Sequence, residues 1–330
     1  MIKKLLLIFL LTYPQFSYSN VEIDFNIWLN KFKIRALKKG ISEETINNSF
    51  KNAKYLKQVI KYDRYQPEFF EDTKTYINKR ATRSRMLKAK ALLIKNQKLF
   101  DEVEKKFNVE KELLLALWGI ETNFGKHVGK MDIISSLATL SFDKRRSEFF
   151  SKELIILLKL IDQKLVDVDT LYGSWAGAFG NFQFMPSSIE NYAIDYDKNG
   201  KIELKQSLHD AVASAANYLN KIGWKYQSSC FYKVKLTKPI PKKYINTSAK
   251  KIKNYMTIKS WKKKGIVDIE HISDKNKAAL VIPDLAVPEG NENSPAFLVF
   301  KNYEKILKWN RSLRFGVTIC TLANMIKNEI

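Results

Sequence analysis

A single ionisable side chain stands in the largely apolar stretch LLLALWGIETNFG, residues 113–125. It is Glu121, and the apolar residues before it would fall on every side of a helix, which is the pattern of a buried helix. Burying a lone carboxylate costs several kcal/mol unless the group is paired or protonated. The stretch therefore predicts either a structural glutamate paired with an arginine or a functional acid, and both readings stay open at this point.

A second stretch that suggests chemistry is the glycine-rich loop GSWAGAFGNFQFMPSS, residues 173–188. Its glycines suit a chain that must approach a ligand or another segment closely. The loop mixes hydrogen-bonding side chains with flat aromatic ones: Ser174, Asn181, Gln183, Trp175, Phe179 and Phe184. Such a mixture suits sugars, whose rings stack on aromatic faces and whose hydroxyls bond to amides. Core packing would also explain the aromatic residues, but it explains the density of glycines less well.

The loop DYDKNGKIELKQ, residues 195–206, matches the first part of an EF-hand calcium loop. The oxygen ligands that it would offer, with a backbone carbonyl at the seventh position, are those of Asp195, Asp197, Asn199, Lys201 and Glu203. Gly200 occupies the sixth position, but Gln206 stands where the motif has a bidentate glutamate. One such loop favours a structural Ca²⁺ over a calcium sensor. A metal-free turn is the alternative.

The elements that must position these residues are mainly helical. Residues 22 to about 110 have a helical pattern, and SRMLKAKALLIKNQKLFDEVEKKF spaces its apolar residues as one helix face would. Residues 111 to about 225 are helical again, interrupted by the two loops. From residue 230 to about 300, prolines alternate with the β-favouring runs CFYKVKL, AALVIPDL and AFLVF. The tail RFGVTICTLANMIKN then returns to a helix.

The N-terminus has the features of a secretory signal peptide. Two lysines precede an apolar run from Leu5 to Leu11, and a small-x-small site ends at Ser19. No cysteine lies near that site for a lipid anchor, and no later stretch is apolar enough to span a membrane. We therefore expect cleavage near Ser19 and an exported, periplasmic protein. Cys230 and Cys320 either pair in such an oxidising compartment or stay as buried thiols.

The net charge of the chain is strongly positive, +23 from 57 basic and 34 acidic residues. Nucleic acid is the first partner that this charge suggests. The lysines are dispersed, however, and an exported protein rarely meets nucleic acid. An anionic polymer of the envelope or an anionic membrane surface fits better, and a solvated lysine-rich surface is the plainest explanation.

Four segments, in order and at similar spacing, resemble the successive motifs of the lytic murein transglycosylase B family of bacteria: ALWGIETNFG, LATLSFDKRRSEFFSKEL, GSWAGAFGNFQFMPSS and ASAANYLNKIGW. YQPEF, residues 65–69, matches an earlier segment of that family. The resemblance covers residues 60 to 225 and then thins to KWNRS and the final helix. Four motifs together are highly specific.

The resemblance implies a mainly α (α+β) fold: a lysozyme-like helical catalytic core with an N-terminal helical domain and a small β-rich insertion. The C-terminal helix is expected to pack back on the core. The expected regions are a signal peptide at 1–19, the N-terminal helical domain at 20–110, the catalytic core at 111–225, the β-rich segment at 226–300 and the C-terminal helix at 301–330.

The resemblance also assigns a role to Glu121. The matching glutamate is the family's sole catalytic acid/base, which cleaves the β-1,4 bond from N-acetylmuramic acid to N-acetylglucosamine in peptidoglycan. Glu121 stands near the end of its predicted helix, with Asn123 and Gly125 as stop signals. Burial and the negative helix end both favour the protonated carboxyl, which can donate to the glycosidic oxygen.

No second carboxylate lies beside Glu121 in the sequence or within residues 173–188, although most glycosidases use a pair. The family implies a reason. The substrate's own N-acetyl group stabilises the cation at the anomeric carbon, and the muramyl 6-hydroxyl then attacks that carbon while Glu121, now a base, takes its proton. The product is a 1,6-anhydromuramyl end, formed without net use of water and without a cofactor. The pocket must hold that hydroxyl in place.

The resemblance further implies substrate contacts at Ser174, Gln183, Arg145, Arg146, Tyr218 and Asn310. The paired arginines suit the carboxylates of the stem peptide. A surface pair at a helix start is the alternative for the arginines, and a buried core residue is the alternative for the tyrosine. Trp309 and Phe315 stand where some relatives carry tyrosine, which leaves those two positions without a hydroxyl.

The expected partner is therefore the glycan strand of peptidoglycan, with other cell-wall enzymes and peripheral membrane contact as further ones. We expect a monomer that does not bind nucleic acid. Two other functions fit the same residues. A hydrolytic muramidase would differ only in letting water reach the intermediate, and a non-catalytic peptidoglycan-binding envelope protein would use Glu121 structurally.

Overall fold

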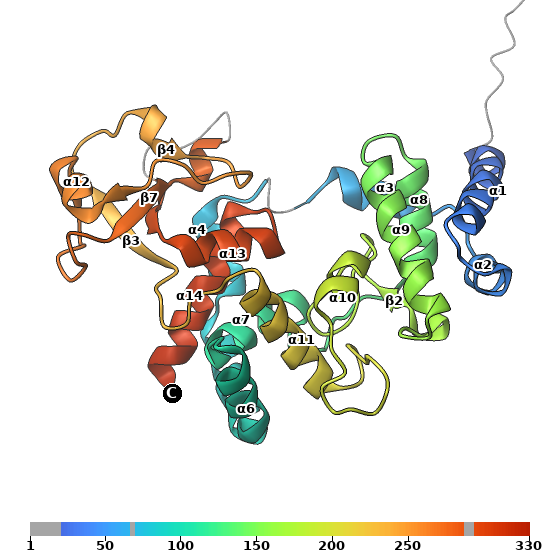
Figure 1. Cartoon of the computed structure of the whole chain (residues 1–330). Helices are drawn as coiled ribbons and strands as arrows, with labels where there is room; N and C mark the ends of the chain where they lie inside the picture. Colours follow the sequence, from blue (N-terminus) through green and yellow to red (C-terminus); the bar gives the residue numbers. More distant parts are fainter. Residues whose placement is uncertain (1–20, 67–69, 287–293) are drawn as a thin grey trace, which may run out of the picture.

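The computed structural model describes residues 21–66, 70–286 and 294–330 (Figure 1). The expected signal peptide and residues 67–69 of YQPEF lie outside these ranges. In chain order the α-helices are α1 (Val21–Lys38), α2 (Glu43–Phe50), α3 (Lys57–Arg64), α4 (Thr73–Arg80), α5 (Arg83–Lys95), α6 (Gln97–Phe107), α7 (Lys111–Thr122), α8 (Ile133–Phe142), α9 (Ser147–Asp162), α10 (Pro186–Tyr192), α11 (Leu208–Lys221), α12 (Ile258–Lys263), α13 (Lys301–Trp309) and α14 (Leu313–Glu329). Among the described residues, no helix is both long and apolar enough to cross a lipid bilayer.

The strands form one very small sheet and one larger sheet. In chain order they are β1 (Met131–Asp132), β2 (Tyr172–Gly173), β3 (Phe231–Leu236), β4 (Ile245–Asn246), β5 (Met256–Thr257), β6 (Ile266–Val267), β7 (Lys277–Val281) and β8 (Ala296–Val299). The larger sheet has the order β4-β7-β8-β3-β6, with β5 also paired to β7. Strand β4 runs parallel to β7, and the other pairs are antiparallel. The three predicted β-favouring runs became β3, β7 and β8, so that prediction is confirmed.

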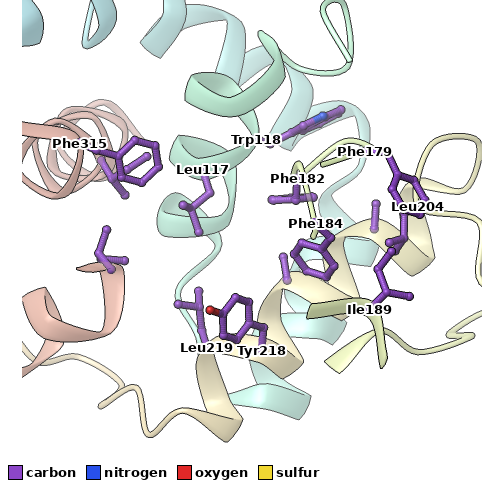
Figure 2. Packing of buried hydrophobic residues seen from close by; sticks show 14 of the residues in the cluster. Leu117, Trp118, Phe179, Phe182, Phe184, Ile189, Leu204, Tyr218, Leu219 and Phe315 are labelled. Carbon is purple, nitrogen blue, oxygen red and sulfur yellow. The ribbon is translucent and has the colours of Figure 1, made fainter. Parts of the chain in front are cut away.

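Helix α7 lies at the centre of the helical core. Helix α14 packs along α7 and continues to α4 and α5, while α6 and α11 cover other sides of α7. Figure 2 shows Leu117 and Trp118 of α7 together with Phe184 of the glycine-rich loop, Tyr218 of α11 and Phe315 of α14. All five side chains are buried. Neighbours on every side explain why α7 is apolar around its whole circumference.

The hairpin of α8 and α9 organises the remaining helices. Helices α1, α2 and α3 pack on this hairpin, and α10 packs on α9. In Figure 1 this group lies at one side of the molecule, and the larger sheet lies at the other. The first 110 residues therefore serve both parts, because α4 and α5 join α7 and α14. The domain boundaries at residues 110, 225 and 300 stay predictions.

Local sequence signals start and end the helices. The side chains of Ser42, Thr82, Asp132 and Ser207 each accept a backbone N–H of the first helical turn that follows them. The long helical pattern of residues 84–107 divides at Asn96, whose φ of −121° and ψ of 27° leave the helical region. One predicted helix face is therefore two helices, α5 and α6.

A covalent link joins the sheet to the helical core. Cys230, just before β3, forms a disulfide with Cys320 of α14, 90 residues later. Of the two alternatives for these cysteines, the structure contains the pair. The tail RFGVTICTLANMIKN is α14, which packs back on α7 as predicted.

Candidate active site

Glu121 lies in the last turn of α7, where the backbone turns into the left-handed region. Asn123, Phe124 and Gly125 have φ values of 50°, 60° and 79°, so the predicted stop signals are confirmed. A Cβ atom on Gly125 would come within 2.7 Å of Oδ1 of Asn181, which makes glycine necessary for space as well as for conformation. The helix before Glu121 is buried as predicted, but Glu121 itself is partly exposed. Its carboxyl reaches an open surface.

Asn181 ties this helix end to both unusual loops. Its Oδ1 accepts the indole N–H of Trp118 at 2.9 Å, and its backbone carbonyl accepts the hydroxyl of Thr122 at 2.8 Å. Its amide nitrogen donates to the carbonyls of Leu204 and Lys205 at 3.1 and 3.0 Å. Asn181 is buried, so it is a structural link and not the sugar contact that the loop sequence suggested.

Glu121 opens onto a pocket of about 370 Å³. The described residues that line the pocket are Tyr62, Tyr65, Gln66, Glu121, Ser174, Trp175, Ala178, Gln183, Trp309 and Asn310. The structure thus brings Ser174, Gln183 and Asn310, three of the predicted substrate contacts, to the same pocket as Glu121. These residues come from four parts of the chain: the end of α3, the end of α7, the glycine-rich loop and the junction of α13 with α14.

Trp309 holds the carboxyl directly. Its indole Nε1–H donates to Oε1 of Glu121 at 3.0 Å. The ring stacks on Tyr218, with the centroids 4.8 Å apart, and meets Phe184 edge-on at 5.3 Å. Because an indole N–H is only a donor, Oε1 must act as the acceptor, and a proton on this carboxyl resides on Oε2. Position 309, where some relatives carry tyrosine, therefore supplies an indole N–H as the donor in place of a hydroxyl.

Tyr218 lies behind this tryptophan and not among the residues that line the pocket. Its hydroxyl donates to the carbonyl of Lys308 at 3.1 Å, and its ring stacks on Tyr192 at 4.3 Å. Burial, with a smaller contribution from Tyr192, raises the pKa of Tyr218 to about 12. The geometry matches the core residue of the two alternatives and shows no direct opening from Tyr218 to the pocket.

Arg145 and Arg146 both bind the buried carboxylate of Asp63. Nε of Arg145 donates to Oδ2 of Asp63 at 2.7 Å, and Arg146 donates to Oδ1. Burial alone would raise the pKa of Asp63, but hydrogen bonds from both arginines outweigh it and hold the pKa below its usual range. The arginines do not line the pocket of Glu121; they anchor α3, which contributes Tyr62 to that pocket. About two fifths of each arginine side chain remains exposed.

One family matches nearly the whole chain. The family model described as the transglycosylase SLT domain matches residues 24–324. The chain belongs to this family. The resemblance found in the sequence motifs is therefore confirmed, and the pocket around Glu121 is the candidate active site of a transglycosylase SLT domain.

Known proteins that are similar to this transglycosylase SLT domain support the same family assignment. The membrane-bound lytic murein transglycosylase B of Escherichia coli (strain K12) is 43% identical over 119 residues, which are 36% of this chain and 33% of the relative. That match therefore spans about a third of the relative's length. SltB3 from Pseudomonas aeruginosa, solved with NAG-NAM-pentapeptide, is 30% identical with a TM-score of 0.81 over 92% of this chain and 79% of its own.

The lytic transglycosylase Slt35 of Escherichia coli, solved in complex with calcium, has the same fold. It is 23% identical, with a TM-score of 0.76 over 95% of each chain. Together with SltB3 it confirms the predicted mainly helical, lysozyme-like fold with small sheets.

In this transglycosylase SLT domain, the EF-hand-like loop of residues 195–206 brings carboxylates close together. Oxygens of Asp195, Asp197 and Asp210 lie within 4.8 Å of one another. Asp210 belongs to α11 and was not predicted from the sequence. Its Oδ1 accepts the N–H of Tyr196 at 2.8 Å, and its Oδ2 accepts the N–H of Glu203 at 2.9 Å. Asp210 thereby closes the loop beyond the point where Gln206 replaces the expected glutamate.

The other predicted ligands hold the same loop through short-range bonds. Nδ2 of Asn199 donates to Glu203 at 3.1 Å, and the N–H of Lys201 donates to Oδ1 of Asn199 at 2.9 Å. The carboxylate of Asp195 accepts the N–H of Gly200 at 2.8 Å. Hard oxygen donors in this number fit a Ca²⁺ ion, and the internal bonds show that the loop can also fold as a turn.

Sequence reasoning missed part of the pocket. Tyr62 gave no signal, since one tyrosine in a short helix is common. Tyr65 and Gln66 belong to YQPEF, but no role at the pocket was assigned to them, whereas Trp175 of the glycine-rich loop was suggested as a flat face for a sugar and does line the pocket. Trp309 drew notice only as a departure from tyrosine, because a pairing across 188 residues to Glu121 leaves no local pattern.

Proposed function

We propose that this chain is a lytic transglycosylase that cleaves the β-1,4 bond between N-acetylmuramic acid and N-acetylglucosamine in peptidoglycan and leaves 1,6-anhydromuramyl ends. The observation that carries the proposal is the placement of Glu121 in one pocket with Ser174, Gln183 and Asn310. Among the described residues that line the pocket, Glu121 is the only carboxylate, which suits a reaction with one acid/base. Family membership and the names of the similar proteins support the same activity.

In the proposed reaction Glu121 first donates its proton and later accepts another. Its Oε2–H protonates the glycosidic oxygen while the bond from that oxygen to the muramyl anomeric carbon breaks. The N-acetyl carbonyl oxygen of the same sugar stabilises the cation. The muramyl 6-hydroxyl then bonds to the anomeric carbon, and its proton returns to Glu121. Trp309 keeps Oε1 as an acceptor throughout, so that one oxygen faces both transfers.

The pocket walls are suited to holding the sugar. The amide nitrogen of Gln183 donates to the carbonyls of Val128 and Gly180 at 3.1 and 3.0 Å, which fixes the orientation of the side chain. The hydroxyl of Ser174 accepts the N–H of Ala178 at 3.1 Å, which fixes the orientation of the Ser174 side chain. Tyr62, Tyr65 and Trp175 add aromatic faces for sugar rings. Fixed polar groups beside aromatic faces lower the entropy cost of placing the 6-hydroxyl for attack.

We assign the stem peptide to the exposed edges of Arg145 and Arg146. Asp63 holds both guanidinium groups in place, and it leaves about two fifths of each side chain exposed. Preorganised guanidinium groups bind carboxylates well. The similar SltB3 was solved with a muramyl pentapeptide, which is consistent with a peptide-binding region in the family.

We further propose a structural Ca²⁺ in the loop of residues 195–206. The ligands would come from Asp195, Asp197, Asn199, Glu203 and the carbonyl of Lys201. The convergence of carboxylates supports the proposal, as does the calcium reported for Slt35. None of these ligands lines the pocket of Glu121, so the ion would stabilise the loop and take no part in the chemistry.

The proposed location is the periplasm, after removal of the signal peptide. The Cys230–Cys320 disulfide supports an oxidising compartment. The proposed partner is the peptidoglycan strand, bound by a monomer, with other cell-wall enzymes as further partners.

Product analysis of digested sacculi tests the activity. We expect wild-type protein to release muropeptides with anhydromuramyl ends, each lighter by one water than the reducing form. Glu121→Gln keeps the shape of the side chain and removes the acid, so it should lower the rate at least about a thousandfold. Sacculus clearance by Glu121→Gln at the wild-type rate would refute the catalytic assignment.

The same experiment separates the alternatives. Reducing ends in place of anhydro ends would identify a hydrolytic muramidase on the same fold. Binding of sacculi without release of any product would identify a non-catalytic envelope protein. The names of the similar proteins favour the transglycosylase over both alternatives.

A further inference from the structure

Helix α1 has an exposed apolar face. Its large apolar side chains on that face, with exposed fractions of 57, 51, 55 and 40%, are Ile23, Ile27, Ile34 and Leu37. A second apolar face of the same helix is buried and consists of Phe25, Leu29, Phe32 and Ala36. Core packing therefore explains one half of the apolar residues of α1 and leaves the isoleucines unexplained.

The two faces lie on opposite sides of the helix. Because an α-helix turns about 100° per residue, positions 23, 27 and 34 fall within about 40° of one another. The buried positions 25 and 32 lie on the far side of the axis. Helices α2 and α8 pack on α1, and the buried face contacts them through Phe32 against Phe50 of α2 and Phe25 against Phe142 of α8. In Figure 1, α1 stands at the edge of the molecule, with α8 and α9 on its inner side.

Positive charge borders this face. Lys31, Arg35 and Lys38 are exposed and lie along one flank of the isoleucines. The two acidic residues of α1, Glu22 and Asp24, are confined to its first turn, and the uncharged, exposed Asn26 and Asn30 also lie at this face. The whole chain carries +23. Apolar side chains flanked by basic ones are the pattern of a helix that lies in a lipid–water interface.

We propose that the outer face of α1 docks on the surface of an anionic phospholipid bilayer. The isoleucines and Leu37 would enter the boundary between headgroups and acyl chains, and the basic flank would meet lipid phosphates. The proposed periplasmic location gives access to such a surface. The test below uses no peptidoglycan, so its failure and that of the proposed activity are separate results.

Vesicle cosedimentation tests the proposal. The protein should start at Asn20, the form that export would leave, so that the apolar run of residues 5–11 cannot bind lipid. We expect binding to vesicles of phosphatidylglycerol and phosphatidylethanolamine, weakened by salt, and little binding to phosphatidylcholine. The triple variant Ile23→Gln, Ile27→Gln, Ile34→Gln should bind the anionic vesicles at least about tenfold more weakly.

A matched control removes exposed apolar side chains elsewhere. Leu87 and Ile94 of α5 are 44% and 66% exposed, and the double variant Leu87→Gln, Ile94→Gln should bind as the wild type does. A circular dichroism spectrum and a melting temperature equal to those of the wild type would show that the triple variant is folded. No binding by the wild type, or equal binding by the triple variant, overturns the proposal. A wild-type dimer in light scattering that the triple variant converts to a monomer would assign the face to a second copy and overturn it as well.

Discussion

At the scale of single residues, the proposed chemistry depends on Glu121 and Trp309. The carboxyl accepts the indole N–H at 3.0 Å, and the indole is itself held by its stack on Tyr218. An indole does not titrate in the working range and donates to the carboxyl in either protonation state. It therefore keeps one orientation of the carboxyl while the proton leaves and returns.

Removing that donor should slow catalysis without preventing binding. Trp309→Phe keeps an aromatic ring beside Tyr218 but removes the indole N–H together with the second ring. A hydrogen bond to a charged group contributes about 1.5 to 3 kcal/mol, so we expect kcat to fall about tenfold or more with little change in KM. The rate of release of anhydromuropeptides measures it. Trp261→Phe is the matched control, because its indole N–H donates to Ala278 inside the sheet. Equal kcat values for the two variants would show that the Trp309 bond has no catalytic effect.

At the scale of elements, buried polar side chains fix the segments that surround the pocket. Asp63 joins α3 to the start of α9, Asn181 joins the glycine-rich loop to α7, and Asp210 joins α11 to the metal-like loop. Asp63 and Asp210 were not predicted, and Asn181 was suggested only as a sugar contact, since each of the three acts between segments that are apart in the sequence. The helices themselves were predictable, because caps and apolar periodicity are local.

The Asp63 link should make the stability of the protein depend on pH. Since the pKa of Asp63 is lowered on folding, its carboxylate stabilises the folded state above about pH 4 and loses that effect as the pH falls through the lowered pKa. Asp63→Asn should reduce the free energy of unfolding by about 2 kcal/mol at neutral pH, because it weakens hydrogen bonds to charged groups, and the difference from wild type should shrink in acid. Urea unfolding at several pH values measures this. Glu148→Gln, in an exposed pair with Lys152, is the control and should change almost nothing.

Binding of Ca²⁺ to the EF-hand-like loop of residues 195–206 should raise the thermal stability of the protein. If Ca²⁺ binds only the folded state, a concentration of about a hundred times Kd stabilises the protein by about 2.7 kcal/mol. We expect the melting temperature to rise by a few degrees with Ca²⁺ and to fall back with a chelator. Asp195→Asn should abolish the rise. Asp167→Asn, whose side chain caps a nearby turn, should retain it. If Ca²⁺ does not change the melting temperature of the wild type, the loop is a metal-free turn.

At the scale of the whole molecule, α14 joins the sheet module to the catalytic core. It packs on α7, and its Arg314 pairs with the buried Asp284, which also accepts from Thr73 of α4. The Cys230–Cys320 disulfide adds a covalent link at the other end of the same interface. The position of Trp309, the last residue of α13, therefore depends on contacts far from the pocket.

Loss of the disulfide should destabilise the whole chain. A bond that closes a 90-residue loop restricts the unfolded state by about 4 to 5 kcal/mol. We expect the double variant Cys230→Ser, Cys320→Ser to unfold at a lower urea concentration by a corresponding amount. A reducing agent should lower the stability of wild-type protein in the same way and have no effect on the double variant. Wild-type stability that is indifferent to reduction would contradict the link.

The sequence by itself determined the family, the helices, the β-favouring runs and the identity of Glu121 as the candidate acid, because motifs, caps and periodicity are local properties of the chain. Through the resemblance, it also predicted Ser174, Gln183 and Asn310 as substrate contacts, and these residues line the pocket of Glu121. Only the tertiary structure decided that Trp309 holds Glu121, that Asp63 occupies Arg145 and Arg146, and that Tyr218 lies behind the pocket wall. Those contacts join residues 82 to 188 positions apart, and packing, not local pattern, sets which of them meet.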